Sequence, residues 1–92
     1  MFRIGSFLFV DSDKENPKAP TQKGEKVITY GMNPKSTITI SAINDEKATI
    51  CVQRGFTNSS GREIEPQEIV VNNNENEDVL LNTAISLVVG PL

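Results

Sequence analysis

The sequence predicts an all-β domain, a small antiparallel β-sandwich or barrel of about six short strands. Apolar and polar residues alternate with a period of two in several short runs, which is typical of half-buried strands. Gly, Pro, Asn and Ser recur about every eight to fifteen residues between these runs and indicate turns. No segment shows a convincing helical period. The 92 residues form a single small domain in this interpretation, long enough for one core.

The clearest element is a hairpin between residues 36 and 56. Its alternating apolar residues are Ile38, Ile40 and Ala42 in the first run and Ala48, Ile50 and Val52 in the second. Residues 44–47, Asn-Asp-Glu-Lys, tolerate turn geometry and join the two runs. An isolated hairpin is only marginally stable in water, so we expect its apolar face to pack on further strands.

The remaining strands are expected at 2–10, 27–32 and 67–72, with one or two more between 79 and 89. Residues 60–63, Ser-Gly-Arg-Glu, match a capping box, but the β-branched residues 69–71 favour a strand over a helix. In the last segment, Ile85, Leu87 and Val89 fall on one face of a strand. Residues 11–24 contain Pro17, Pro20 and several charges without apolar periodicity. They predict a mobile loop, or an arm that reaches a neighbouring molecule.

The N-terminal strand is apolar on both faces at residues 7–10. Such a run is typical of a strand buried on both sides, or of one that packs against another chain. If the second interpretation holds, replacing Phe7 and Phe9 with Ser should disrupt assembly more than folding. The interface candidates are Phe2, Ile4, Phe7, Phe9, Tyr30 and Phe56.

The net charge of −3 is unevenly distributed. Residues 1–58 carry eight basic and six acidic side chains, and residues 59–92 carry one basic and six acidic ones, so the halves are +2 and −5. The acidic half argues against nucleic acid as a partner, because affinity for phosphates comes mainly from Lys and Arg. It is either a solvated acidic surface or a surface that faces the basic half of a neighbouring copy.

The composition excludes several kinds of catalytic chemistry. Cys51 is the only thiol and the chain has no histidine, so an internal disulfide, a Cys/His zinc site and a Ser-His-Asp triad are impossible within it. Glu63 and Glu65 could pair as carboxylates, but alternating acids on a strand are typical of a solvated face. We therefore expect no enzyme activity, no catalytic residues and no cofactor.

Two further motifs are expected to be structural. Residues 72–78 are rich in oxygen ligands but lack the spacing of a calcium-binding EF-hand, which indicates a polar turn and no metal site. The sequence Asn58-Ser59-Ser60 matches the N-glycosylation pattern, yet the opening residues show no signal-peptide cleavage site. No apolar run approaches the ~20 residues that span a bilayer. The expected location is cytoplasmic, or the virion if a phage encodes the chain.

Four short segments, Gly24-Glu25-Lys26-Val27, Ile38-Thr39-Ile40, Ala48-Thr49-Ile50-Cys51-Val52 and Arg62-Glu63-Ile64, follow one another along the chain. Together they resemble the strand pattern of carbon-storage-regulator RNA-binding dimers. They cover under half of the chain, their gaps differ from that family's, and the N-terminal strand and acidic tail have no counterpart in it. The resemblance implies RNA binding as one form of the alternative function described next.

The function expected first is a non-enzymatic structural or assembly module that acts by protein–protein contact, as a homo-oligomer or within a larger assembly. A virion decoration, tail or fibre component would fit this architecture. The alternative is a small regulatory module that binds RNA, a nucleotide or a host protein. Its candidate ligand contacts are Lys23, Lys26, Lys35 and Arg54.

Overall fold

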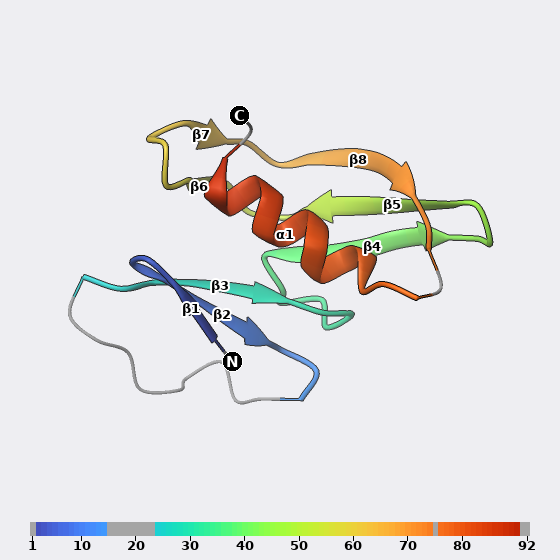
Figure 1. The fold of residues 1–92 in the computed structure, drawn as a ribbon, viewed down its shortest axis with the longest axis horizontal. Helices are drawn as coiled ribbons and strands as arrows, with labels where there is room; N and C mark the ends of the chain where they lie inside the picture. The colour runs from blue at the N-terminus through green and yellow to red at the C-terminus, as the bar shows by residue number, and fades with distance from the viewer. Residues whose placement is uncertain (1, 15–23, 75, 91–92) are drawn as a thin grey trace.

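The computed structural model describes residues 2–14, 24–74 and 76–90, which are mostly sheet, with eight strands and one helix. The strands are β1 (Phe2–Ile4), β2 (Phe7–Asp11), β3 (Lys26–Tyr30), β4 (Ile38–Ile43), β5 (Lys47–Val52), β6 (Phe56–Thr57), β7 (Glu63–Ile64) and β8 (Gln67–Asn72). The helix is α1 (Val79–Val89), which lies across one face of the sheet (Figure 1). Because strands predominate, the prediction of an all-β fold is broadly confirmed.

Six of the strands form one sheet in the order β1-β2-β3-β4-β5-β8, and β6 and β7 form a separate pair. The large sheet is mixed, because β2–β3 and β3–β4 are parallel while the other neighbours are antiparallel. β3 and β4 share one residue pair, Tyr30 with Ile38, so the sheet is joined narrowly at this point. The fold is therefore a six-stranded mixed sheet with a helix on it and a separate β6–β7 pair, whereas the sequence predicted a purely antiparallel arrangement without a helix.

The central hairpin is confirmed as β4 and β5. The side-chain Oδ1 of Asn44 accepts hydrogen bonds from the backbone N–H groups of Glu46 and Lys47, both at 2.8 Å, which fixes the turn. The register shifts between Ile40 and Ala42, so the alternation of the sequence ends in a bulge. Beyond this bulge β4 is exposed, whereas Ala48, Ile50 and Val52 of β5 are all buried.

The single N-terminal strand predicted at 2–10 is wrong, because β1 and β2 form an antiparallel hairpin around Gly5 and Ser6. Ile4 pairs with Phe7, and Gly5 has φ 57, which matches a turn with Gly at its first central position. The sequence carried this signal as a Gly-Ser pair between two apolar runs. The two-sided burial of residues 7–10 does hold, since Phe7, Leu8, Phe9 and Val10 are 3%, 0%, 0% and 0% exposed.

The final strands predicted at 79–89 are also wrong, because this segment is α1. The carboxylate of Asp78 accepts a hydrogen bond from the N–H of Leu81 at 3.0 Å and caps the helix at its start. Leu80, Ala84 and Val88 are the buried helix residues, and their spacing of four is helical. The alternation at 85, 87 and 89 was coincidental.

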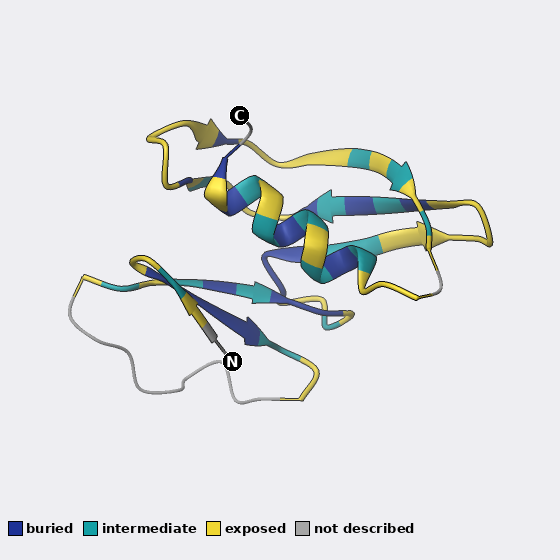
Figure 2. Cartoon of the chain, in the orientation of Figure 1, coloured by how far each residue is buried: buried dark blue, intermediate teal, exposed yellow. Residues whose placement is uncertain are grey.

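The core lies between α1 and the sheet (Figure 2). Its buried residues are Phe7, Phe9, Ile28, Tyr30, Ile38, Ala48, Ile50, Leu80, Ala84 and Val88. The helix packs mainly on β3, β4 and β5. β8 is the outermost strand on its side of the sheet and is exposed along most of its length (Figure 2).

Candidate functional site: an open strand edge beside an apolar groove

β8 presents unpaired main-chain groups at the edge of the sheet. The N–H of Asn73 donates to the carbonyl of Glu46 at 2.9 Å, so this pair belongs to the hydrogen-bonded class of the β5–β8 ladder. Opposite residues in an antiparallel ladder alternate between the two classes. Glu68, Val70 and Asn72 therefore direct their N–H and C=O groups away from β5. Within the described ranges, no further strand pairs with β8.

This edge carries one charged side chain, Glu68, but otherwise lacks the usual protection against strand pairing. Natural edges are made short or carry Pro, Lys or a bulge, which prevents other chains from pairing with them. β1, at the opposite edge, has three residues, whereas β8 has six in continuous register with β5. β8 contains no Pro or Lys, and the side chain of Val70 at its centre is 64% exposed. An exposed β-branched residue at the centre of an open edge favours pairing with another chain.

A groove of about 870 Å³ runs between β8 and α1 on the helix side of the sheet. It exists because α1 lies over β3, β4 and β5 and leaves the helix-side residues of β8 partly uncovered. Its apolar lining comes from Ile64, Ile69 and Val71 on the strand side and from Ile85, Leu87 and Val89 on the helix. The volume is in the range of ligand sites in proteins, and the lining is mainly apolar.

The helix side of the groove has a regular spacing. Asn82, Ile85, Ser86 and Val89 all line it, and positions i, i+3, i+4 and i+7 share one helix face. Val89 is 42% exposed, which leaves an apolar side chain at the mouth of the groove. The polar ends of Asn82 and Ser86 lie between apolar neighbours on this face and can orient a bound chain by hydrogen bonding.

The β6–β7 loop fixes the end of α1 and so closes one end of the groove. Asn58 Nδ2 donates to the carbonyl of Leu87 at 3.2 Å, and the N–H and Oγ of Ser59 donate to the carbonyls of Val88 and Val89, both at 2.8 Å. Carbonyls in the last helical turn lack intrahelical partners, so these bonds replace the missing ones. Asn58 is 3% exposed, and its amide nitrogen is engaged with Leu87, which leaves the glycosylation pattern without an exposed acceptor.

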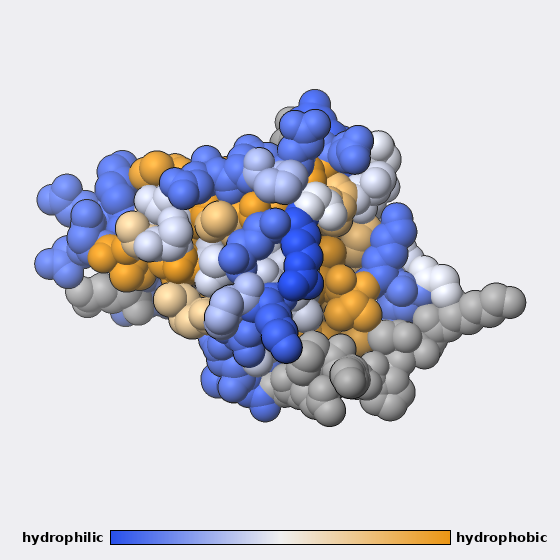
Figure 3. Space-filling view, turned by 180° about the vertical axis from the view of Figure 1, so that it is seen from behind, coloured by the Kyte–Doolittle hydropathy of each residue, from blue (hydrophilic) through white to orange (hydrophobic). Residues whose placement is uncertain are grey.

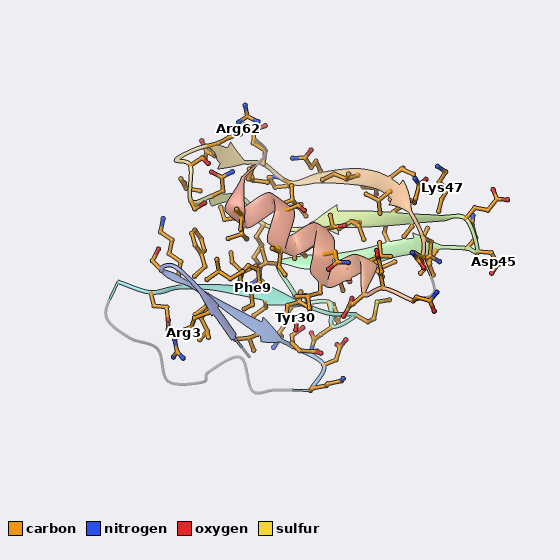
Figure 4. The ribbon with its side chains drawn as sticks, in the orientation of Figure 1. Arg3, Phe9, Tyr30, Asp45, Lys47 and Arg62 are labelled. Atoms are coloured by element: carbon orange, nitrogen blue, oxygen red, sulfur yellow. The ribbon has the colours of Figure 1, made fainter. Side chains whose placement is uncertain are left out.

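The charge around the groove is negative. Arg62 is the last basic residue of the sequence, and six carboxylates follow it. Glu63 lies in β7, Glu65 lies between β7 and β8, Glu68 lies on β8, and Glu77 lies in the segment before α1; all four are exposed. Two cations also lie near this site: Arg62 lines the groove, and Lys47 Nζ donates to the side-chain Oδ1 of Asn72 at 2.6 Å, whereas Arg3 lies at a separate corner of the molecule (Figure 4).

The six interface candidates are distributed over the N-terminal half of the sheet and β6. Phe7, Phe9 and Tyr30 belong to the buried core, at 3%, 0% and 9% exposure. Ile4 and Phe56 are half-buried and pack on that core, and Phe2 pairs with Phe9 in the β1–β2 hairpin. None of the six belongs to β8, and among the five whose side chains are described none lines the groove. Their role in an interface stays a prediction.

The predicted basic contacts are not brought together. Lys26 begins β3, with its Nζ 5.5 Å from the centre of the Phe7 ring, whereas Lys35 lies in the loop beyond the other end of that strand. Arg54 is exposed after β5. Lys23 and most of the predicted loop or arm at 11–24 lie outside the described residues. These positions supply no shared basic surface among the described residues.

Other chemistry is limited in the described part of the chain. The thiol of Cys51 is half-buried on β5. Among the residues that the structure describes, no three His, Cys, Asp or Glu side chains are grouped to hold a metal ion, and no helix has the length and apolar character to cross a bilayer. On the sheet face away from α1, hydrophobic and hydrophilic residues are interspersed (Figure 3).

No family model, curated protein or solved structure matches this chain. The candidate site therefore rests on geometry. Sequence reasoning identified β8 but missed the groove, because the groove requires α1. Asp78 before the apolar run and Gly90-Pro91 after it are start and stop signals for that helix and could have identified it.

Proposed function

We propose that this chain is a non-enzymatic protein-contact module that binds an extended segment of a protein at the edge of β8. The observation that carries the proposal is the combination of outward main-chain groups on Glu68, Val70 and Asn72 with an apolar groove beside the same strand. Strand addition uses both features, because main-chain hydrogen bonds supply affinity and pockets for alternate side chains supply specificity.

This proposal keeps the protein-contact role expected from the sequence and moves the contact from the N-terminal strand to β8. The apolar side chains of Phe7 and Phe9 are used within the chain's own core, whereas those of Val70 and Val89 are 64% and 42% exposed. Exposed apolar groups next to unpaired main-chain groups gain most from being covered by a partner. Such a contact would also serve to hold the chain in a larger assembly, for example a virion.

A random peptide library selected on the full chain tests the proposal. We expect enriched sequences to lack Pro, to alternate β-branched residues with polar ones, and to compete with one another for one site. A Val70→Pro variant removes an outward N–H without removing a bond to β5, so the enriched peptides should lose binding to it. Val70→Ala keeps that N–H and serves as the matched control. The proposal would be contradicted if no peptides were enriched, or if the enriched peptides bound equally to the unaltered protein, Val70→Pro and Val70→Ala.

A further inference from the structure

Resting on the proposed function, we infer that the occupant of the β8 site is a basic extended segment of a different protein. It adds to the sheet as a seventh strand, with apolar residues facing the groove and Lys or Arg residues alternating with them. The juxtaposition that carries this inference is an open strand edge, an apolar groove on one side of it and three carboxylates, Glu63, Glu65 and Glu68, toward its Gln67 end.

The pleat of β8 sets the pattern of the segment. Ile69 and Val71 face the helix side and line the groove, whereas Glu68, Val70 and Asn72 have their side chains on the other face. A strand paired with β8 has the same alternation in register with it. Its groove-side residues meet an apolar lining and are expected to be Val, Ile or Leu. Its other residues lie beside Glu68, where an opposite charge is favourable.

The charges near β8 indicate the sign of the charge that the partner segment carries. Glu63 and Glu65 precede β8 and Glu68 lies on it, so an extended segment paired with β8 has three carboxylates along the half of the edge near Gln67. The nearby cations are Arg62, which lines the groove, and Lys47, whose Nζ donates to Asn72 Oδ1 at the other end of β8. Complementary charge of this kind increases the rate of association and suppresses wrong partners. An acidic segment would meet like charges at Glu63, Glu65 and Glu68, along the half of the edge near Gln67.

A second copy of this chain fits the site less well. Pairing two β8 edges about a twofold axis would bring the two acidic halves together, each with a charge of −5 over residues 59–92. Pairing β8 with β1 of another copy would use the three-residue strand Phe2–Ile4, where Arg3 already forms an ion pair with Glu25 at 2.6 Å. Neither edge of the same chain supplies a long basic strand.

Defined peptides test this inference by fluorescence anisotropy. The basic probe is the labelled heptapeptide Lys-Val-Lys-Val-Thr-Ile-Lys, and the matched probe is Glu-Val-Glu-Val-Thr-Ile-Glu. We expect the full chain to bind the basic peptide at least tenfold more tightly, and the difference to shrink as salt is raised. Val70→Pro should weaken binding of the basic peptide at least tenfold, and Val70→Ala less than threefold. A Lys-Val-Lys-Val-Thr-Ile-Lys peptide N-methylated at alternate residues, tested on the unaltered protein, should bind at least tenfold more weakly, which makes the result independent of how Val70→Pro folds.

The failures of the two proposals are distinguishable. Equal binding of the acidic and basic peptides, with loss of both in Val70→Pro, would overturn the basic partner and leave the strand-edge contact standing. If light scattering shows a dimer that Val70→Pro dissociates, and neither peptide binds, the occupant of the site is a second copy of this chain. That result would overturn the inference that the occupant is a different protein. Binding of the basic peptide that is unaffected by both Val70→Pro and N-methylation would overturn the edge geometry itself. Absence of peptide binding and of self-association would overturn both proposals.

Discussion

The side-chain amide of Asn58 donates a hydrogen bond to the main-chain carbonyl of Leu87, across 29 residues of sequence. The same side chain accepts hydrogen bonds from the N–H groups of Ser60 and Arg62 at 3.0 and 2.9 Å. One buried side chain therefore orders the β6–β7 loop and anchors the end of α1. Because α1 forms one wall of the groove, the position of that wall depends on Asn58.

Replacing Asn58 with Ala should lower the free energy of unfolding by about 2–3 kcal/mol, because it leaves several buried or half-buried main-chain groups without partners. Urea denaturation followed by circular dichroism measures this loss. Ser60→Ala is the matched control in the same loop, since Ser60 is exposed, and it should change stability by less than ~0.5 kcal/mol. Equal effects of the two substitutions would contradict the role given to Asn58.

Replacing Phe9 with Ala should destabilise folding rather than a contact between chains. The Phe9 side chain is fully buried, and deleting a buried phenyl ring costs about 3–5 kcal/mol, which is a large part of the stability of a small domain. A role of Phe7 and Phe9 in assembly stays a prediction beside this core placement. Phe56→Ala, which removes a half-buried ring, should cost less in the same urea titration. A Phe9→Ala protein with unchanged stability would contradict the core placement.

Replacing Gly31 with Ala should destabilise the loop between β3 and β4. Gly31 has φ 144, and a Cβ there would lie 2.7 Å from Asp13 Oδ2. That carboxylate accepts hydrogen bonds from the N–H groups of Met32 and Asn33 at 2.7 and 2.9 Å, so it cannot move without losing them. We expect a loss of about 1–3 kcal/mol from strain at such a backbone conformation.

Gly61→Ala is the control for Gly31. Gly61 also has a positive φ, 82, but a Cβ there meets no atom within 4 Å. The Gly61→Ala variant therefore reports the loss of stability caused by the backbone conformation alone, without a steric clash, and we expect about 1 kcal/mol. Thermal unfolding of the two variants separates the effect of the backbone conformation from that of the steric clash. A larger loss of stability in Gly61→Ala than in Gly31→Ala would contradict the predicted clash.

Local patterns predicted the strands whose neighbours are close in sequence. The hairpin of β4 and β5 follows from alternation, because apolar residues of these strands face the core. The strand β8 follows from the β-branched residues 69–71. The parallel pairing of β2 with β3 and of β3 with β4 was missed, since no short-range signal distinguishes it from antiparallel pairing. It depends on where the chain returns to the sheet.

The two wrong elements have local causes. The segment 2–10 was treated as one strand because its apolar residues hid the turn signal at Gly5 and Ser6. The segment 79–89 was treated as strand because Ile85, Leu87 and Val89 alternate along it, and the capping signal at Asp78 was not considered. The groove could not be predicted even with α1 assigned, because it depends on how far the helix is displaced from β8 across the sheet.

The central claim is that the outward main-chain groups of β8 bind an incoming strand, and residue-resolved amide hydrogen exchange tests it most directly. In the protein alone, the amides of Ile69 and Val71 should exchange slowly and those of Glu68, Val70 and Asn72 rapidly. The basic heptapeptide should slow exchange at Glu68, Val70 and Asn72 at least tenfold and leave Ile69 and Val71 nearly unchanged. Slow exchange at the three outward amides without the peptide, or no slowing when the peptide is bound, would contradict the claim.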